Sequence, residues 1–184
     1  MSGIATSHSE RHPLQTRGFT LLELLVVIGI IAFLAALILV AMSGARRSAA
    51  SVQCLSNLRQ IHSAFVHYAN DHGGRLPDPI ANGTSWEASL YPYLKSTDVF
   101  RCGADEEVFP AVGSSYDWRD TGSDTTSLVG RSMALVRQDA ALAFDALPGW
   151  HKRNRINVIL VDGSAHSMDQ DDYFRELAKP IAGQ

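Results

Sequence analysis

The feature that most constrains this chain is a long stretch without charge: residues 24–45 contain no Asp, Glu, Lys or Arg. Residues 24–42 are apolar on every face of a helix, and such a helix belongs in lipid or in the middle of a bundle. About 20 apolar residues span a bilayer, whereas the core of a secretory signal has only about 7–15. The small residues at 41–45 imitate a signal cleavage site, so that alternative stays open. The stretch predicts a membrane-linked chain.

The remainder of the chain is mildly acidic. Of all residues 46% are hydrophobic and 19% charged, and the net charge is -3. Residues 1–18 hold one acidic and two basic side chains, Glu10, Arg11 and Arg17, which leaves 18 acidic and 14 basic ones in the rest. A mildly acidic domain argues against nonspecific nucleic-acid binding, so we expect no nucleic-acid partner. At 184 residues the chain has room for one modest domain and an anchoring helix.

Glu23 stands at the edge of the apolar stretch, where a carboxylate is costly and therefore a candidate functional group. Gly18, followed by Phe19-Thr20-Leu21-Leu22-Glu23 and the apolar run, resembles the class III signal of type IV prepilins and type II secretion pseudopilins. The resemblance implies that a prepilin peptidase cuts between Gly18 and Phe19 and methylates the new amino group of Phe19. It also implies that Glu23 pairs with the terminal amine of a neighbouring subunit, so that two buried charges neutralise each other.

The same resemblance implies an organisation and a set of partners. We expect a leader peptide over residues 1–18, a transmembrane and filament-core helix over residues 19–45, and an extracytoplasmic pilin-like head over residues 46–184. Before assembly the chain would cross the inner membrane once, in contact with its lipid and with the head in the periplasm. It would then join a periplasmic or surface filament of its own copies, with the help of an assembly ATPase and a polytopic platform membrane protein.

Beyond residue 46 the sequence becomes amphipathic. Apolar residues recur at three- and four-residue steps, at Val52, Leu55, Leu58, Ile61, Phe65 and Tyr68. This pattern predicts one helix over about residues 19–71, ended by His72-Gly73-Gly74, with one stripe packed on a sheet. We expect strands at 132–136, 141–144, 156–161 and 164–168, a short helix through residues 86–90, a loop over about 98–128, and a last helix capped by Asp171 or Asp172. The predicted class is α+β and pilin-like, a long amino-terminal helix on a small antiparallel sheet.

The head also has a family likeness. Cys54-x-x-Asn57-Leu58-Arg59-Gln60-Ile61, then Tyr68-Ala69-Asn70-Asp71 and Val99-Phe100-Arg101-Cys102, resembles prepilin-like proteins abundant in planctomycetes and verrucomicrobia. Many of these end with His, about nine residues, and Asp-Gly. Here ten residues separate His151 from Asp162-Gly163, where Asp-Gly predicts a hairpin turn. We expect His151, Asp162 and Gly163 to organise this terminal hairpin.

Three groups of residues suggest chemistry in the head. Cys54 and Cys102 are the only cysteines and form either one disulfide or two separate buried thiols. Asp117, Asp120 and Asp124 lie in an oxygen-rich loop that binds calcium or is a solvated turn. An acid–base set of His151, Asp145 and Asp162 would lack an activated nucleophile, so we expect no enzymatic activity and no required cofactor.

Two functions fit these observations. The first is a structural subunit, a pilin or pseudopilin, of a type IV pilus-like or type II secretion filament. The second is a membrane-tethered binding module whose head recognises a polysaccharide or another ligand and which uses the pilin signal for delivery.

Overall fold

A computed structural model describes residues 19–182 of the chain. The expected leader, with Gly18, lies outside the described residues. The chain divides into two compact units, Met1–Ala41 and Met42–Gln184. The second unit is called the head below.

The first element is one long helix, α1 (Leu21–Asp71), which has 51 residues. No proline interrupts it, and its ending follows from the two glycines after His72. Gly73 and Gly74 have φ values of 63° and 80°, and the Gly74 N–H donates to the Ala69 carbonyl at 2.7 Å. Glycine enters this left-handed conformation without a Cβ penalty, which is why it terminates helices. The helix predicted over residues 19–71 is confirmed to within two residues.

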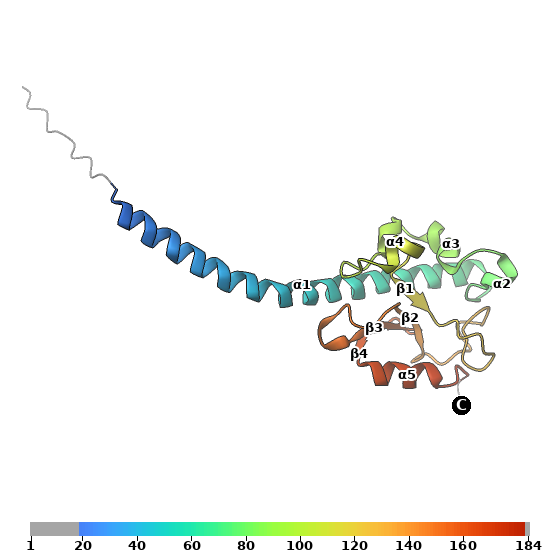
Figure 1. The fold of residues 1–184 in the computed structure, drawn as a ribbon. Coiled ribbons are helices and arrows are strands. Elements are labelled where there is room, and N and C mark those ends of the chain that lie inside the picture. The colour runs from blue at the N-terminus through green and yellow to red at the C-terminus, as the bar shows by residue number, and fades with distance from the viewer. Residues whose placement is uncertain (1–18, 183–184) are drawn as a thin grey trace, which may run out of the picture. The chain divides into compact units, whose positions relative to one another are not determined.

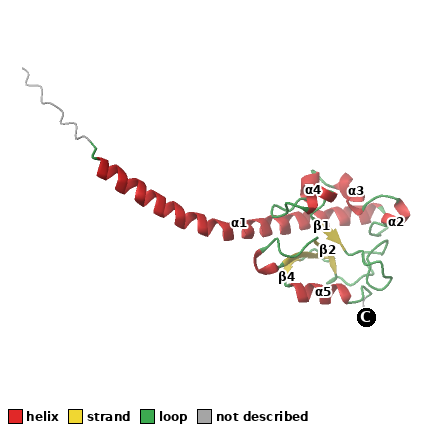
Figure 2. Ribbon diagram, viewed as in Figure 1, coloured by secondary structure: helices red, strands yellow, loops and turns green. Residues whose placement is uncertain are grey.

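The head contains one antiparallel sheet with strand order β1-β2-β3-β4 (Figures 1 and 2). Its strands are β1 (Tyr116–Trp118), β2 (Ala141–Asp145), β3 (Ile156–Leu160) and β4 (Ala165–Met168). Helices flank the sheet, and the predicted fold class, a long amino-terminal helix packed on a small antiparallel sheet, is confirmed.

Both faces of the sheet are covered, which explains why β2 and β3 are buried at every position. The α1 side carries Leu142, Ala143, Ile159 and Val161, which share a core with the buried stripe of α1 at Cys54, Leu58, Ile61, Phe65 and Tyr68. The other side carries Ala141, Phe144, Ile156, Val158 and Leu160, which pack with Tyr173 of α5 (Gln170–Ala178). A register shift between Ala141 and Ala143 places Leu142 and Ala143 on the same face.

The remaining elements are short. An aromatic cluster packs against the carboxy-terminal part of α1. In it, Phe65 of α1 stacks on Trp86 and Trp118, with ring centroids 5.8 and 5.6 Å away. The short elements are α2 (Pro79–Asn82), α3 (Trp86–Leu90), η1 (Tyr91–Tyr93), η2 (Thr97–Phe100), α4 (Val108–Val112) and η3 (Lys152–Asn154). The predicted helix at 86–90 is confirmed, with Ser85 as its cap.

Three local predictions were wrong. Residues 132–136 form no strand, because only their ends pair, Ser132 with Arg75 and Val136 with Ala182. The expected loop at 98–128 instead contains η2, α4 and β1. The cap of α5 is Asp169, whose carboxylate accepts the Asp172 N–H at 2.9 Å, so neither Asp171 nor Asp172 begins this helix.

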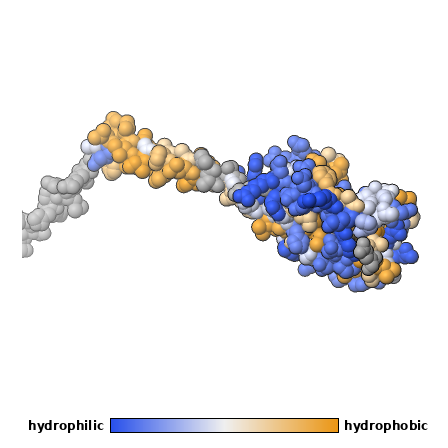
Figure 3. Space-filling view, turned by 90° about the horizontal axis from the view of Figure 1, so that it is seen from below, coloured by the Kyte–Doolittle hydropathy of each residue, from blue (hydrophilic) through white to orange (hydrophobic). Residues whose placement is uncertain are grey.

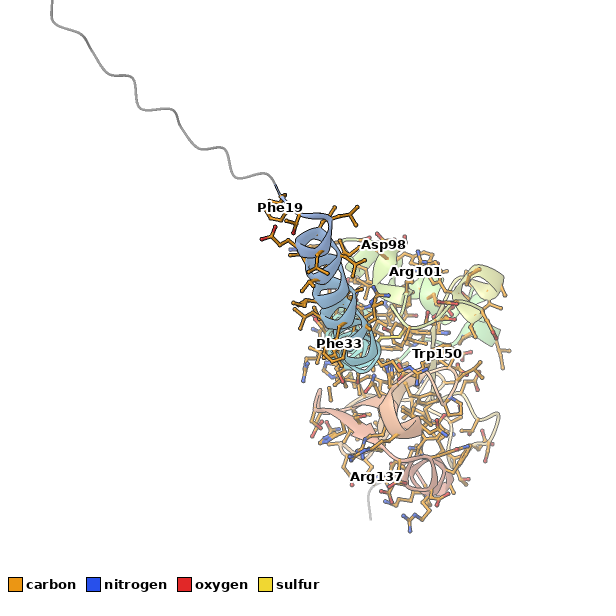
Figure 4. The ribbon with its side chains drawn as sticks, turned by 60° about the vertical axis from the view of Figure 1, so that its left-hand side comes forward. Phe19, Phe33, Asp98, Arg101, Arg137 and Trp150 are labelled. Carbon is orange, nitrogen blue, oxygen red and sulfur yellow. A yellow bond between two sulfur atoms is a disulfide. The ribbon has the colours of Figure 1, made fainter. Side chains whose placement is uncertain are left out.

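Arg119 joins the sheet to the carboxy-terminal helix. Its side chain is fully buried beside Glu176, with Nη1 3.3 Å from Oε1, and its Nη2 donates to the carbonyls of Leu177 and Lys179. Leu177 lies in the last turn of α5 and Lys179 is the C-cap residue, and carbonyls at a helix end lack partners within the helix. Arg137 pairs with the same glutamate and is labelled in Figure 4.

Candidate functional site

The apolar part of α1 buries nothing within its own unit. The large hydrophobic side chains between Leu21 and Leu39 are between 45% exposed, at Val27, and 82% exposed, at Leu21. An 18-residue window of this helix has a mean hydropathy of 3.3 and no buried residue, so it is long and apolar enough to cross a membrane. Figure 3 shows that the described surface of this helix is largely hydrophobic. A signal sequence near the amino terminus can pass the same hydropathy test, although its apolar core is shorter, at about 7–15 residues, so the residues at the start of the helix are also informative.

Those residues form a reciprocal cap. The Thr20 N–H and the Thr20 hydroxyl donate to Glu23 Oε2 at 2.9 and 2.8 Å, and the Glu23 N–H donates to Thr20 Oγ1 at 3.2 Å. This is a capping box, in which Thr20 and Glu23 satisfy each other's backbone donors at the start of α1. Phe19 precedes it and is 78% exposed (Figure 4). The carboxylate of Glu23 is therefore held next to the backbone of Phe19 and Thr20.

Cys54 of α1 and Cys102, which follows η2, form a disulfide in the head. Their Cα atoms are 5.4 Å apart and 48 positions separate them in the sequence. Both residues are fully buried. The Cys102 N–H donates to Ser115 Oγ at 2.9 Å, which fixes the loop on the other side. For a loop of this length the chain-entropy estimate of the stabilisation is about 4 kcal/mol.

His151 lies against the disulfide and against Asp145, the last residue of β2. Its Nε2 is 3.1 Å from Asp145 Oδ2 and 3.8 Å from Cys102 Sγ. Asp145 Oδ2 also accepts the Asn157 N–H at 2.7 Å. Burial raises the pKa of Asp145, and the hydrogen bond and charge of His151 oppose that shift. The histidine is thus a core residue beside the cysteines rather than a part of the β3–β4 turn.

Asp162 and Gly163 make the turn between β3 and β4. Asp162 Oδ1 accepts the Ser164 hydroxyl at 2.7 Å and the Ser164 N–H at 2.8 Å, and these bonds hold the pKa of Asp162 below its usual value. Gly163 has φ 86°, and a Cβ there would lie 2.9 Å from His62 Cε1. His62 Nε2 in turn lies 2.9 Å from the Val161 carbonyl oxygen. The turn therefore packs against α1. Glycine is favoured at position 163 because φ is positive there and because a Cβ would lie too close to His62.

Asp117, Asp120 and Asp124 have separate local partners. Asp117 accepts the Trp118 N–H, Asp120 accepts the Ser127 hydroxyl, and Asp124 pairs with Arg131. Over residues 19–182, the only group of three or more His, Cys, Asp or Glu with ligand atoms within 4.8 Å of one another is a different one, Cys54, Cys102, Asp145 and His151. The three aspartates thus form no compact set of carboxylate ligands in this range.

Sequence reasoning missed the capping box and the position of His151 beside the disulfide. The capping box was visible as Thr-x-x-Glu immediately before an apolar helix, a spacing that predicts it. His151 and Asp145 were named together only as an acid–base set with Asp162, and the contact of His151 with Cys102 had no local signal, because only the folded sheet brings these residues together.

One family matches the chain: residues 14–42 match the prokaryotic N-terminal methylation motif. The match includes Gly18, Phe19 and Glu23 and continues through the apolar part of α1. No match to the chain is found among curated proteins or among solved structures.

The methylation motif marks the prepilin-like, type IV pilin family, whose members are usually non-enzymatic structural proteins. The motif and the helix-on-sheet fold are together typical of a prepilin-like protein. The apolar helix within the matched residues indicates membrane anchoring before assembly.

Proposed function

We propose that this chain is a pilin or pseudopilin, a structural subunit of a type IV pilus-like or type II secretion filament. Residues 1–18 are the leader, and prepilin peptidase cuts between Gly18 and Phe19 and methylates Phe19. Residues 19–45 cross the inner membrane and later form the filament core, while residues 46–184 form the extracytoplasmic head. An assembly ATPase and a platform membrane protein extract the subunit into the filament.

The observation that carries this proposal is the methylation motif joined to a helix that finds no cover in its own unit. Apolar surface of this extent needs a partner, either lipid tails or the helices of other copies. A subunit that moves from the membrane into a filament exchanges the first partner for the second. Open head-to-tail packing of identical subunits produces such filaments.

Glu23 has a defined part in this assembly. Its carboxylate lies at the start of α1, within one turn of the Phe19 amine that cleavage would create. A carboxylate in the apolar core of a filament needs a cationic partner, and the terminal amine of a neighbouring subunit is one. Pairing of Glu23 with that amine would set the axial position of each subunit.

The test is expression of the full chain with its prepilin peptidase and assembly machinery, followed by shearing and pelleting of filaments. Wild type and a control variant on the head surface, Glu106→Ala, should enter the filament fraction. Glu23→Ala should be processed but reduced at least about tenfold in that fraction, since an unpaired charge costs more than about 1.4 kcal/mol. Assembly of Glu23→Ala at the wild-type level, or the absence of wild type from every multimer, would contradict the proposal.

A second candidate, a membrane-tethered binding module, is supported by one observation. The head has an open groove of about 860 Å³ that combines Arg75, Arg131 and Asp120 with the apolar Ile80 and Leu135. Ile80 and Leu135 are 87% and 79% exposed. Polar groups beside exposed apolar side chains suit a polysaccharide. Glycan-array binding by wild type that Arg131→Ala abolishes, with no filaments under any condition, would favour this candidate.

A further inference from the structure

Four metal-ligating side chains meet in the core of the head. Cys54 comes from α1, Cys102 from the segment after η2, Asp145 from the end of β2 and His151 from the position before η3. Their ligand atoms all lie within 4.8 Å of one another, and all four residues are buried. Four separate segments of the chain therefore bring two sulfurs, one imidazole and one carboxylate to one point.

The disulfide alone does not explain this arrangement. The side chains of Asp145 and His151 are 0% and 2% exposed. Among the described residues, Asp145 Oδ1 and His151 Nδ1 have no hydrogen-bond partner. Burying a carboxylate and an imidazole is costly, and apolar side chains of similar size would pack against a disulfide at no such cost. Buried polar atoms without partners need an explanation that the disulfide alone does not give.

The donor set matches zinc. Zn²⁺ takes four ligands in a tetrahedron from Cys sulfur at about 2.3 Å, His nitrogen at about 2.0–2.1 Å and Asp oxygen at about 2.0–2.2 Å. Ligand atoms in such a tetrahedron are about 3.3–3.8 Å apart. The separations in the head already fall under 4.8 Å, so shifts of roughly 1 Å complete the site. Two thiolates favour zinc over calcium or magnesium, which prefer oxygen ligands.

Neighbouring groups hold two of the ligands in place. The Asn157 N–H donates to Asp145 Oδ2 at 2.7 Å, and the Cys102 N–H donates to Ser115 Oγ at 2.9 Å. Hydrogen bonds of this kind orient the ligands of structural metal sites. The connector between Asp145 and His151 is exposed at Leu147, Pro148 and Gly149.

We propose that the head binds one Zn²⁺ through Cys54, Cys102, His151 and Asp145 when the disulfide is reduced. A dithiol reductant supplies two electrons and two protons to the disulfide and itself becomes a cyclic disulfide. The two thiols then release their protons to water as their sulfurs bind zinc. The S–S bond and the zinc ion are alternative crosslinks between α1 and the loop at Cys102. This inference concerns the head alone and does not depend on filament assembly.

The test uses the full chain in detergent micelles, reduced, freed of reductant under nitrogen and titrated with Co²⁺ as a coloured substitute for Zn²⁺. One equivalent should give the thiolate charge-transfer band and the visible bands of tetrahedral cobalt, and Zn²⁺ should remove both. The oxidised chain should give neither band. Because this comparison needs no substitution, it remains decisive even if a variant fails to fold.

Variants then assign the ligands. His151→Ala and Asp145→Asn should each weaken Zn²⁺ binding at least about tenfold, whereas the control His166→Ala, on the exposed part of β4, should leave it unchanged. If reduction unfolds the head, one equivalent of Zn²⁺ should restore its near-ultraviolet circular dichroism. The proposal is wrong if the reduced wild type shows no tetrahedral cobalt spectrum, or if His151→Ala binds as tightly as wild type.

Discussion

The two halves of α1 belong to one continuous helix but differ in how their apolar side chains are covered. Phe33, in the amino-terminal half, is 65% exposed, whereas Phe65, in the head, is completely buried between Trp86 and Trp118. The first half is apolar on all faces, and none of its residues in the apolar window is buried. The second half has one apolar stripe, which the sheet covers. The comparison shows that only the first half depends on a partner from outside the chain.

The largest expected effect is a difference in unfolding free energy between variants of these two phenylalanines. Phe65→Ala should lower the free energy of unfolding of the head by about 3–5 kcal/mol, because it leaves a cavity among packed aromatic rings. Phe33→Ala should change it by less than about 0.5 kcal/mol. Urea titrations in micelles measure this through tryptophan fluorescence, since Trp86, Trp118 and Trp150 all lie in the head. Equal losses of unfolding free energy in the two variants would contradict the view that only the second half of α1 is packed in the head.

The next effect concerns the contact of the β3–β4 turn with α1. Gly163→Ala should cost about 2–3 kcal/mol, because alanine is strained at φ 86° and its Cβ would meet His62. The matched control is Gly83→Ala, where φ is 65° and nothing lies within 4 Å of the added Cβ. That variant should lose only the backbone part, about 1 kcal/mol. Equal losses in the two urea titrations would mean that His62 does not restrict this turn.

A pH-dependent effect follows from Asp105, which lies three residues before the first residue of α4. Burial raises the pKa of Asp105, but hydrogen bonds from Ser115 and from the N–H groups of Val108, Glu107 and Phe109 outweigh it and hold the pKa below its usual value. A depressed folded-state pKa contributes stability above the unfolded-state value of about 3.9, and that stability is lost as the pH falls through the folded-state pKa.

Asp105→Asn should therefore destabilise the head by about 1–2 kcal/mol at pH 7, and the difference from wild type should shrink below about pH 4. Urea titrations at pH 7, 5 and 3.5 measure it. A difference that stays constant over this range would show that the charge of Asp105 contributes nothing to the head.

The smallest effect concerns the start of the apolar half. Thr20→Ala removes the capping box with Glu23 and should destabilise the first turn of α1 by about 1 kcal/mol. Amide hydrogen exchange in micelles should accelerate about fivefold over residues 21–24 and stay unchanged in the head. Faster exchange in the head would contradict the separation of the two halves.

Much of this architecture could be predicted from the sequence, because local sequence patterns indicate α1 and the terminal hairpin. Apolar periodicity predicted α1, and the Asp162-Gly163 turn signal between two strand-like stretches predicted β3 and β4. The strand β1 has three residues within a stretch rich in Gly, Ser, Thr and Asp, and it exists only because Tyr116 and Trp118 pair with β2. Residues 132–136 have strand-like composition, yet Leu135 points to solvent and is 79% exposed. In both cases pairing with residues far away in the sequence, and not local composition, determined whether a strand formed.

The candidate sites divide in the same way. The motif from Gly18 to Glu23 is contiguous, so the sequence alone was sufficient to propose a processing site. The group around His151 draws on residues up to 97 positions apart, Cys54 and His151, and only the sheet brings them together. Contiguous chemistry could be found in the sequence, whereas chemistry assembled by the fold required the structure.

The most direct measurement for the prepilin-like assignment is mass spectrometry of the intact chain isolated from cells that contain its prepilin peptidase. The chain should begin at Phe19 and carry one additional methyl group on its amino terminus. A chain that retains residues 1–18, or one that has been cut near Ala45 as a secretory signal would be, would contradict the assignment and remove the proposed role of Glu23.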